Sequence, residues 1–444
     1  MSRFANLCLL ACALALTAAL PAAAQEGFTV TLSVNKTPSS AGQVLAILCD
    51  DPAARIPGAC HTYSAKADAR PGVTILKFAG VKPGVYAIQA FHDENGNGVF
   101  DFPKEAYAFG NNAPFPPSFK AASITIAADT QTSIDLVNVF SNGAGLQGDK
   151  GVEAPADVVK TDLRSGGLYG ELYVPKQHAK PLPLVIAIGG SEGGLDTMSA
   201  FALPLTAHGY AVLALAYWKE PGLPQSLEGV PLEYFDHAVD WARSQPGVAP
   251  DRIAILGWSR GAEAALLAAS RNPRIHAVVA VSPTAYVWQG LNFSGRGPMK
   301  PAWLVAGAPL PSIVPTNLSA NESFAQTFVD ALSEAERRPE TAIPVEKING
   351  PVLLLSGSDD ALWPANPMSD RIIARLKANR FGHQALHRNF DGAGHAVFVG
   401  DPASMRGLPD STLKFMGGSA PANTKAQQES WLLVLDFLGR ALGR

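Results

Sequence analysis

One short segment constrains the fold of this chain more than any other: an apolar run at 253–256, a tight pentapeptide, and a helical pattern at 262–270. The pentapeptide is Gly257-Trp258-Ser259-Arg260-Gly261. Side chains at 257 and 261 would collide with the neighbouring strand and helix as the backbone turns. A G-x-S-x-G pattern alone says little in a chain with 41 glycines. Its position between a strand and a helix is the setting that exposes a reactive serine, here Ser259.

Strand and helix patterns alternate along the chain after about residue 158. Continuous apolar runs, which are typical of buried parallel strands, lie at 184–188 and 211–217, and further strands are predicted at 253–256, 277–281, 352–355 and 386–390. Amphipathic helical patterns lie between and after them, at 231–244, 262–270, 368–378 and 427–442. This alternation predicts an α/β fold, with a mostly parallel sheet that is covered by helices on both faces.

Residues 285–345 interrupt the alternation and are rich in Pro, Gly, Ser and Trp. An insertion between two core strands would lie over the carboxyl ends of the strands, where such sheets bind ligands. We therefore predict a substrate-shaping cap at 285–345. The alternative is a surface loop that has no role in substrate binding.

Residues 28–140 have the pattern of an all-β domain. Apolar and polar residues alternate at 28–34, 73–78, 85–91 and 134–139, and turn residues separate these runs. A small β-sandwich is the expected architecture. Ser, Asn, Gly, Gln and Asp then follow without periodicity, so the predicted domains are a β-sandwich-like domain at 25–140, a linker at 141–157 and a catalytic domain at 158–444.

The first residues have the pattern of a secretory signal peptide. Arg3 is followed by an apolar run from Leu7 to Leu20, and Ala22-Ala23-Ala24 predicts cleavage between Ala24 and Gln25. The expected location is periplasmic or secreted, with no transmembrane segment after cleavage. A membrane anchor is the alternative, but the run is short for a spanning helix.

Cysteine usage and charge also bear on the compartment and the partners. Cys49 and Cys60 remain after cleavage and could close a small disulfide loop, the alternative being two free thiols. The net charge of −3 comes without any basic stripe, which argues against a nucleic-acid partner.

A nucleophilic serine needs a base, and the base needs an orienting acid. In this fold the three follow in the order serine, acid, histidine. The acid is expected at Asp360, with Asp359 as the alternative, because both follow the strand at 352–355. His395 follows the last strand in a Gly-rich loop. His383 and His387 lie in a turn pattern and in the strand itself, and are weaker candidates.

The oxyanion of an acyl intermediate needs hydrogen-bond donors. One is expected at the backbone amide of Arg260, directly after the nucleophile. The other is expected in the loop Gly189-Gly190-Ser191-Glu192-Gly193-Gly194, at the amide of Ser191 or Glu192. A phosphate-binding loop is the alternative, but the segment lacks the P-loop spacing and the Lys-Ser/Thr ending.

Several separate motifs resemble one family. They are Gly189 to Leu195, Tyr210 to Tyr217, Pro231 to Phe235, Ser259 to Glu263 and Ile348 to Trp363 with Pro364. Together they resemble the C-terminal domain of the acyl-CoA thioesterase and bile-acid-CoA:amino-acid N-acyltransferase family, over about residues 160 to 440. The resemblance implies an α/β-hydrolase fold and a Ser259–Asp360–His395 triad. Arg260 stands where the family usually has Lys, and the acyltransferase branch has cysteine in place of the serine.

The N-terminal half resembles a widespread uncharacterised bacterial exported domain. It carries the segment from Asp93 to Asp101 that defines this resemblance. Oxygen-bearing side chains at Asp93, Asn95, Asn97 and Asp101 imitate a calcium loop, but Lys104 stands where the bidentate Glu is required. A tight turn held by side-chain-to-backbone bonds is the preferred interpretation, and a structural calcium ion is the alternative. No other cofactor is expected.

The sequence thus predicts an exported serine hydrolase that cleaves a small-molecule acyl ester or thioester through an acyl-enzyme. Peptidases and dienelactone hydrolases share the fold, so amide and lactone substrates stay open. The competing hypothesis from another class is a non-catalytic envelope binding protein that uses the hydrolase domain as a scaffold.

Overall fold

The computed structural model of the chain describes residues 27–53, 60, 62–101, 105–113, 115, 117–138, 153–292, 299–315, 324–403 and 415–443. The predicted signal peptide at 1–24 and most of the predicted linker at 141–157 lie outside these residues. Among the described helices, none has the length and the apolar composition that a membrane crossing would need.

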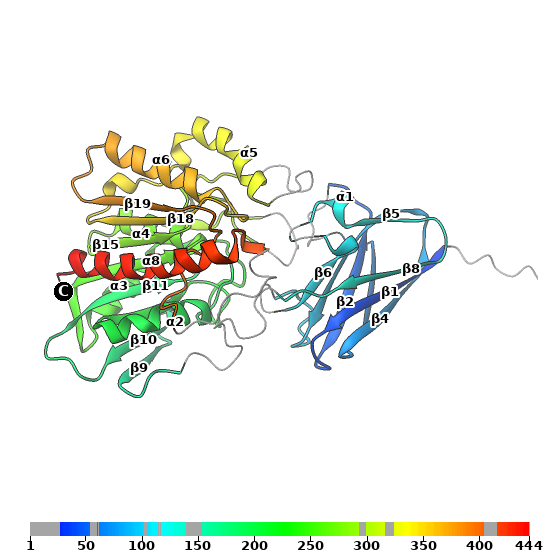
Figure 1. Ribbon diagram of the computed structural model, residues 1–444, viewed down its shortest axis with the longest axis horizontal. Coiled ribbons are helices and arrows are strands. Elements are labelled where there is room, and N and C mark those ends of the chain that lie inside the picture. Colours follow the sequence, from blue (N-terminus) through cyan, green and yellow to red (C-terminus); the bar gives the residue numbers. More distant parts are fainter. Residues whose placement is uncertain are drawn as a thin grey trace, which may run out of the picture.

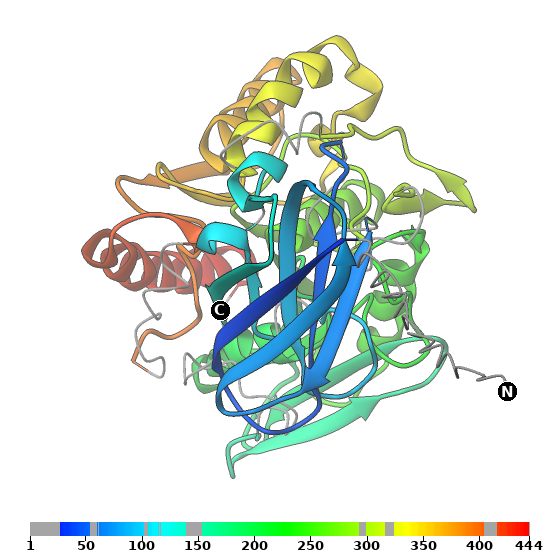
Figure 2. The same cartoon turned by 90° about the vertical axis from the view of Figure 1, so that its right-hand side faces the viewer.

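The N-terminal part of the chain folds as two β-sheets (Figures 1 and 2). Their strands are β1 (Phe28–Thr37), β2 (Gln43–Cys49), β3 (Tyr63–Asp68), β4 (Gly72–Val81), β5 (Gly84–Asp93), β6 (Tyr107–Phe109), β7 (Ser123–Ile126) and β8 (Thr130–Asp135), with short helices η1 (Gly110–Asn112) and α1 (Phe119–Ala122). One sheet has the order β4-β1-β8, and the other has β3-β2-β5-β6 with β7 paired to β5.

The two sheets enclose one apolar core. Val30, Leu32 and Val34 of β1 are fully buried, and their neighbours along the strand point outward, as the two-residue period of a strand requires. They pack in one cluster with residues of the second sheet such as Leu48 and Ile88. The predicted sandwich-like architecture is therefore confirmed.

One predicted strand is displaced. The expected run at 134–139 begins inside β8, which ends at Asp135. Leu136 still donates its amide to Asn35, but the chain then bridges through Val137 to Tyr107 of the other sheet. The apolar alternation therefore continues beyond the strand because the chain crosses from one sheet to the other.

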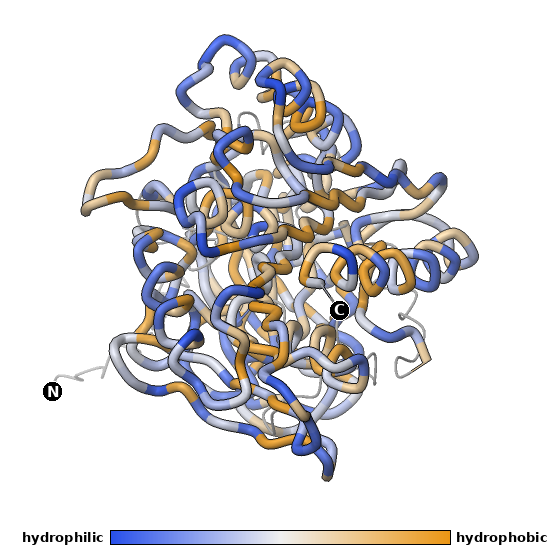
Figure 3. Tube along the Cα trace, turned by 90° about the vertical axis from the view of Figure 1, so that its left-hand side faces the viewer, coloured by the Kyte–Doolittle hydropathy of each residue, from blue (hydrophilic) through white to orange (hydrophobic). Residues whose placement is uncertain are grey.

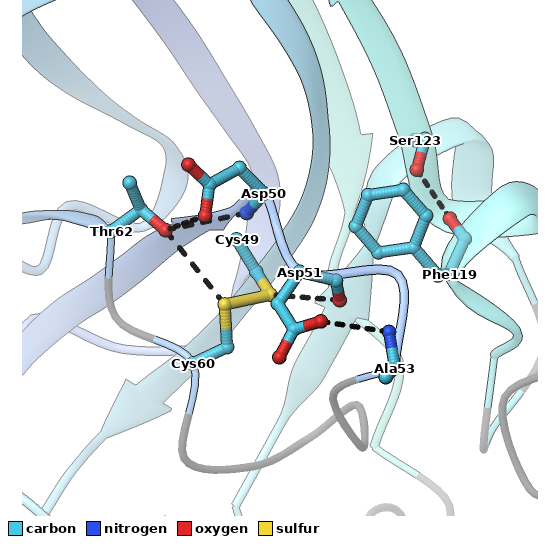
Figure 4. The surroundings of a disulfide bond; sticks show 8 residues. All are labelled: Cys49, Asp50, Asp51, Ala53, Cys60, Thr62, Phe119 and Ser123. Carbon is cyan, nitrogen blue, oxygen red and sulfur yellow. Dashed lines mark hydrogen bonds between the residues drawn. A yellow bond between two sulfur atoms is a disulfide. The ribbon is translucent and has the colours of Figure 1, made fainter.

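Cys49 and Cys60 form a disulfide (Figure 4), with Cα atoms 5.3 Å apart. Thr62 donates a hydrogen bond to Asp50 beside it, with 2.6 Å between Oγ1 and Oδ1. The disulfide links the end of β2, at Cys49, to Cys60, which comes 11 residues later in the chain. The structure therefore has the disulfide and not two free thiols.

Reduction of this disulfide should destabilise the N-terminal sandwich by about 2 to 3 kcal/mol, because a closed loop of this length restricts the unfolded chain. Thermal unfolding with and without dithiothreitol measures the effect. The double variant Cys49→Ser/Cys60→Ser is the control and should not respond to dithiothreitol. An unchanged melting temperature of the wild-type sandwich after verified reduction would contradict the prediction.

The C-terminal part is built on one sheet of eight strands (Figure 1). They are β9 (Val158–Leu163), β10 (Tyr169–Pro175), β11 (Leu182–Ile188), β12 (Ala211–Ala216), β14 (Val248–Trp258), β15 (Ala277–Val281), β18 (Val352–Gly357) and β19 (Ala385–Phe390). Their order is β19-β18-β15-β14-β11-β12-β10-β9. In this order, every neighbouring pair from β19 through to β12 is parallel, and β10 is antiparallel to both of its neighbours, β12 and β9. This is the α/β-hydrolase sheet, and the predicted fold is confirmed.

Helices cover both faces of the sheet. On one face lie α3 (Glu233–Arg243), α4 (Arg260–Arg271) and α6 (Ala365–Ala378), and on the other lie α2 (Asp196–Ala202), η2 (Leu203–His208) and α8 (Ala420–Ala441). Side chains of alternate strand positions enter two separate apolar cores, one under each layer of helices. In Figure 3 hydrophobic colours gather in the middle of this part of the chain, whereas the outer segments carry both colours.

The segment at 285–345 contains more regular structure than its composition indicated. It holds β16 (Trp303–Val305), which pairs with β13 (Val230–Pro231), then β17 (Ala308–Pro309), α5 (Phe324–Arg337) and η3 (Pro339–Thr341), and η4 (Val345–Lys347) begins at its last residue. The helix α5 buries a stripe at helical spacing, formed by Phe328, Ala331, Leu332 and Ala335. That periodic signal was present in the sequence but stood among loop-forming residues.

Candidate active site

Ser259 stands at the turn between β14 and α4. Its backbone has φ 58° and ψ −122°, a region that costs a non-glycine residue free energy. The turn is tight because a Cβ atom on Gly257 would lie 2.2 Å from the carbonyl oxygen of Gly261. A Cβ atom on Gly261 would likewise lie 2.2 Å from the carbonyl oxygen of Gly189. The strained serine and its two glycines therefore form the elbow that the sequence indicated.

The structure brings His395 and Asp360 together. His395 Nδ1 lies 2.8 Å from Asp360 Oδ2, and both side chains are almost completely buried. The other carboxylate oxygen of Asp360 accepts hydrogen bonds from the amides of Leu362 and Trp363. Asp360 is thus held in one orientation, and it can fix which nitrogen of the imidazole carries the proton.

The alternative residues lie elsewhere. Asp359 accepts a hydrogen bond from Ser358 and is exposed. His387 lies in β19, where its ring contacts Ser356 and Asp370 instead of the serine elbow. His383 is exposed in the turn before β19. None of these three side chains forms a hydrogen bond with Ser259 or His395.

The second ring nitrogen of His395, Nε2, is the one available for proton transfer. Nε2 is buried and has no hydrogen-bond partner among the described residues. The ring lies beside the indole of Trp258, at 5.6 Å between centroids, and against Trp363 at 6.1 Å. Trp258 directly precedes the nucleophile, so the imidazole stands next to the serine elbow with Nε2 able to accept a proton.

A glycine-containing segment joins the acid and the base. The amide of His395 donates to the carbonyl of Met416 at 2.8 Å, and Gly417 forms a bridge with Asp360. Phe415, at the start of this segment, packs on Phe115 of the N-terminal sandwich, with centroids 5.6 Å apart. The sandwich therefore touches the segment that supports the candidate triad, on the side where α8 begins (Figure 1).

The predicted oxyanion loop lies directly against the nucleophile. A Cβ atom on Gly190 would lie 2.9 Å from Cβ of Ser259, so glycine is needed for this approach. The carboxylate of Glu192 folds back and accepts the amide of Gly190 at 2.8 Å. The two predicted loop donors, the amides of Ser191 and Glu192, directly follow this glycine. Burial raises the pKa of Glu192 to about 7.

The Arg260 side chain has a structural role that its position in the elbow did not reveal. It forms a buried ion pair with Glu263, with 3.0 Å between Nε and Oε2, and donates to the carbonyls of Trp288 and Gln289. Glu263 accepts the indole N–H of Trp303 at 2.7 Å and the amide of Trp288. The first helical turn after the nucleophile therefore anchors the segment at 285–345.

Replacing Glu263 with Ala should destabilise the C-terminal domain by about 3 to 5 kcal/mol, because the Arg260 charge would stay buried without its partner. Urea unfolding of the full chain, followed by tryptophan fluorescence, measures this loss. Glu429→Ala, which removes a partly exposed ion pair with Arg388, is the matched control and should cost less than about 1 kcal/mol. Equal losses in the two variants would refute the anchoring role.

The candidate calcium residues lie in a turn after β5. Asp93 accepts the amides of Asn97 and Gly98, and Asp101 accepts the side-chain amides of Asn95 and Asn97. These are the bonds that a tight turn uses. Among the described residues, no cluster of three or more His, Cys, Asp or Glu side chains is arranged to hold a metal ion. The calcium ion stays a hypothesis.

Two family models match the chain. Residues 230–444 match "BAAT / Acyl-CoA thioester hydrolase C terminal", and residues 32–135 match "Uncharacterized protein conserved in bacteria (DUF2141)". The peroxisomal succinyl-coenzyme A thioesterase of Mus musculus is 30% identical over 293 residues, which cover 64% of this chain and 66% of that protein. The bile acid-CoA:amino acid N-acyltransferase of Mus musculus is 30% identical over 295 residues, with the same coverage.

The match to these two curated relatives is partial, since the chain spans 66% of the length of each. Among solved structures, an esterase of Pyrobaculum calidifontis is similar, with 15% identity and a TM-score of 0.42. That similarity covers 65% of this chain and 88% of the esterase chain.

Proposed function

Because residues 230–444 belong to the BAAT / acyl-CoA thioester hydrolase C-terminal family, we propose that this chain is a serine hydrolase acting on a carboxylic ester or thioester. The observation that carries the proposal is the buried His395–Asp360 pair, which presents an unpartnered Nε2 beside the strained elbow of Ser259. A buried imidazole nitrogen without a partner costs free energy. Such a cost is characteristic of a catalytic site.

In the first half-reaction, Ser259 Oγ attacks the acyl carbonyl carbon and its proton passes to Nε2 of His395. Asp360 stabilises the imidazolium that forms. The carbonyl electron pair becomes an oxyanion, which the amide of Arg260 and the amide of Ser191 or Glu192 bind. When the tetrahedral intermediate collapses, the bond to the leaving group breaks. His395 returns its proton to the departing alkoxide or thiolate, and the acyl group stays on Ser259.

In the second half-reaction, a water molecule takes the place of the leaving group. His395 removes a proton from the water as it attacks the acyl carbon, and Ser259 leaves with the proton from Nε2. The carboxylic acid is released and the free serine is restored. Water is the proposed acceptor because the nucleophile is a serine.

The substrate is proposed as a small acyl ester or thioester rather than as a coenzyme A derivative in particular. The matched relatives carry coenzyme A substrates in their names. An exported enzyme would meet coenzyme A thioesters rarely, however, and the matched region leaves out a third of each relative. The acyl group and the leaving group are therefore open to a screen.

We also propose that the protein is exported, with cleavage between Ala24 and Gln25. The Cys49–Cys60 disulfide supports this location, because disulfides persist in oxidising compartments. Amino-terminal sequencing of the protein from a periplasmic fraction tests it. A mature protein that begins at Gln25 is expected, whereas an uncleaved protein in the cytosol would contradict export.

The function is tested with a panel of acyl esters and acyl thioesters of increasing chain length, alongside lactone and peptide substrates. Wild type should hydrolyse members of the first two classes, and Ser259→Ala is the blank. Activity only on lactones or peptides would favour the dienelactone-hydrolase or peptidase alternative. Hydrolysis of none of them would favour the envelope binding protein.

A further inference from the structure

Glu192 is a buried carboxyl group in the candidate active site that the proposed mechanism does not use. It lies in the loop after β11, and only 8% of its surface is exposed. Its Oε1 accepts the amide of Gly190 at 2.8 Å. The side chain therefore folds inward on the loop that carries a predicted oxyanion donor.

Side chains form hydrogen bonds with both carbonyl and amide groups of this loop. The hydroxyl of Tyr217 donates to the carbonyl of Gly189 at 2.9 Å, and the indole of Trp218 donates to the carbonyl of Gly190 at 3.2 Å. The Glu192 carboxylate holds the amide of Gly190. Side chains therefore occupy both carbonyls and this amide, and they fix the backbone of the loop that carries the predicted donors, the amides of Ser191 and Glu192.

The carboxylate also lies close to the reacting groups. A Cβ atom on Gly190 would lie 2.9 Å from Cβ of Ser259 and 3.1 Å from Oε2 of Glu192. Both side chains therefore lie against the backbone of Gly190. The charged and titratable groups that face Glu192 are His395, Lys219 and Tyr217. A positive charge on His395 favours the ionised form of Glu192, and by reciprocity the carboxylate favours the imidazolium.

We propose that Glu192 is a positioning residue of this active site: it fixes the oxyanion loop, and its carboxylate stabilises the imidazolium of His395 during acyl transfer. The inference rests on the proposed serine-hydrolase function. The imidazolium forms when Nε2 takes the proton of Ser259, at the moment when the oxyanion forms. Glu192 thus helps to stabilise the oxyanion, through the loop, and the imidazolium, through its charge, without touching the substrate.

A pH dependence follows from this role. Since burial raises the pKa of Glu192 to about 7, the carboxylate is present above that pH and is lost as the pH falls through it. Labelling of wild type should therefore slow by about tenfold as the pH falls through about 7, and this step should be absent when residue 192 cannot titrate.

The test measures the second-order rate of labelling by a fluorophosphonate between about pH 5 and 9, a range that spans the titration of Glu192. Glu192→Gln keeps an oxygen that can accept the Gly190 amide but loses the charge. Glu192→Ala loses both. Glu220→Gln is the matched control, because Glu220 Oε1 lies 3.0 Å from a Cβ position on Gly194 of the same loop and outside the machinery.

At pH 8 the rate should fall about 100-fold in Glu192→Ala, as for the loss of an oxyanion donor, and about tenfold in Glu192→Gln. The step near pH 7 should be absent in both variants. Melting temperatures separate these effects from misfolding, and the isosteric Gln variant keeps the test valid if the Ala variant unfolds.

Two failures are distinguishable. Absence of labelling in wild type would refute the proposed function itself. Rapid labelling of wild type, with unchanged rates and an unchanged step near pH 7 in folded Glu192→Gln and Glu192→Ala, would refute only the role of Glu192. Loss of rate in Glu220→Gln equal to that in Glu192→Gln would also overturn it, because the effect would then belong to any carboxylate near the loop.

Discussion

Replacing Ser259 with Ala should lower kcat on an activated acyl ester by about 10⁵- to 10⁶-fold, because no other group can form the acyl-enzyme. The substitution removes one oxygen and leaves the backbone of the elbow in place. The melting temperature should therefore stay close to that of wild type. Steady-state kinetics on purified protein measures the loss, and burst-phase kinetics shows whether an acyl-enzyme accumulates.

The control for this variant is Ser333→Ala, which changes an exposed serine on α5. Its kcat should be that of wild type. A folded Ser259→Ala variant that retained more than about one hundredth of wild-type activity would contradict the role of the serine, since the residual rate of a disabled triad is far lower.

Replacing Asp360 with Asn should lower kcat by about 10⁴-fold at neutral pH. The amide can donate a hydrogen bond to Nδ1, so it favours the imidazole tautomer whose proton is on Nε2. That tautomer cannot accept the proton of Ser259. Asp360 also accepts the amides of Leu362 and Trp363 through Oδ1, and an asparagine oxygen can keep those bonds, so the fold should persist.

The neighbouring acid gives a matched comparison. Asp359→Asn makes the same chemical change one residue earlier, at an exposed side chain that contacts Ser358. Its kcat should stay within about threefold of wild type, as expected for a surface substitution that leaves the site intact. If Asp359→Asn were the damaging variant and Asp360→Asn the silent one, the assignment of the acid would be wrong.

The fold was predictable where apolar periodicity is strong. The central strands β11, β12, β14, β15 and β18 each contain a continuous apolar run that is buried, whereas the edge strand β19 has the sequence ALHRNF, is mostly half-buried and contains no such run. The edge strand β9 has the sequence VVKTDL with only its ends buried, so it resembles a loop. The antiparallel strand β10 is interrupted by Gly170 and Glu171, and no sequence alternation marks it.

The candidate triad was predictable because each member follows a core strand in the chain order that the fold uses. The resemblance to the thioesterase family, which the family model confirms over residues 230–444, rested on the same segments. The supporting contacts were not predictable. Arg260 and Glu263 have the spacing of an exposed i,i+3 helix pair, yet both are buried under Trp288 and Trp303.

The remaining contacts arise from long-range packing that local sequence does not encode. The segment from Phe415 to Gly418 carries a Gly-Gly pair that resembles a simple turn, yet it bridges the loops of Asp360 and His395. The inward fold of the Glu192 side chain likewise depends on Tyr217 and Trp218 closing the loop from the other side.

The central claim is that Ser259 is a nucleophile activated by His395. Labelling of the full chain with a fluorophosphonate, followed by intact and peptide mass spectrometry, tests it most directly. The account predicts one adduct per chain, located on Ser259, absent in Ser259→Ala and much slower to form in His395→Ala. An adduct on another residue, or equal labelling of wild type and Ser259→Ala, would contradict it.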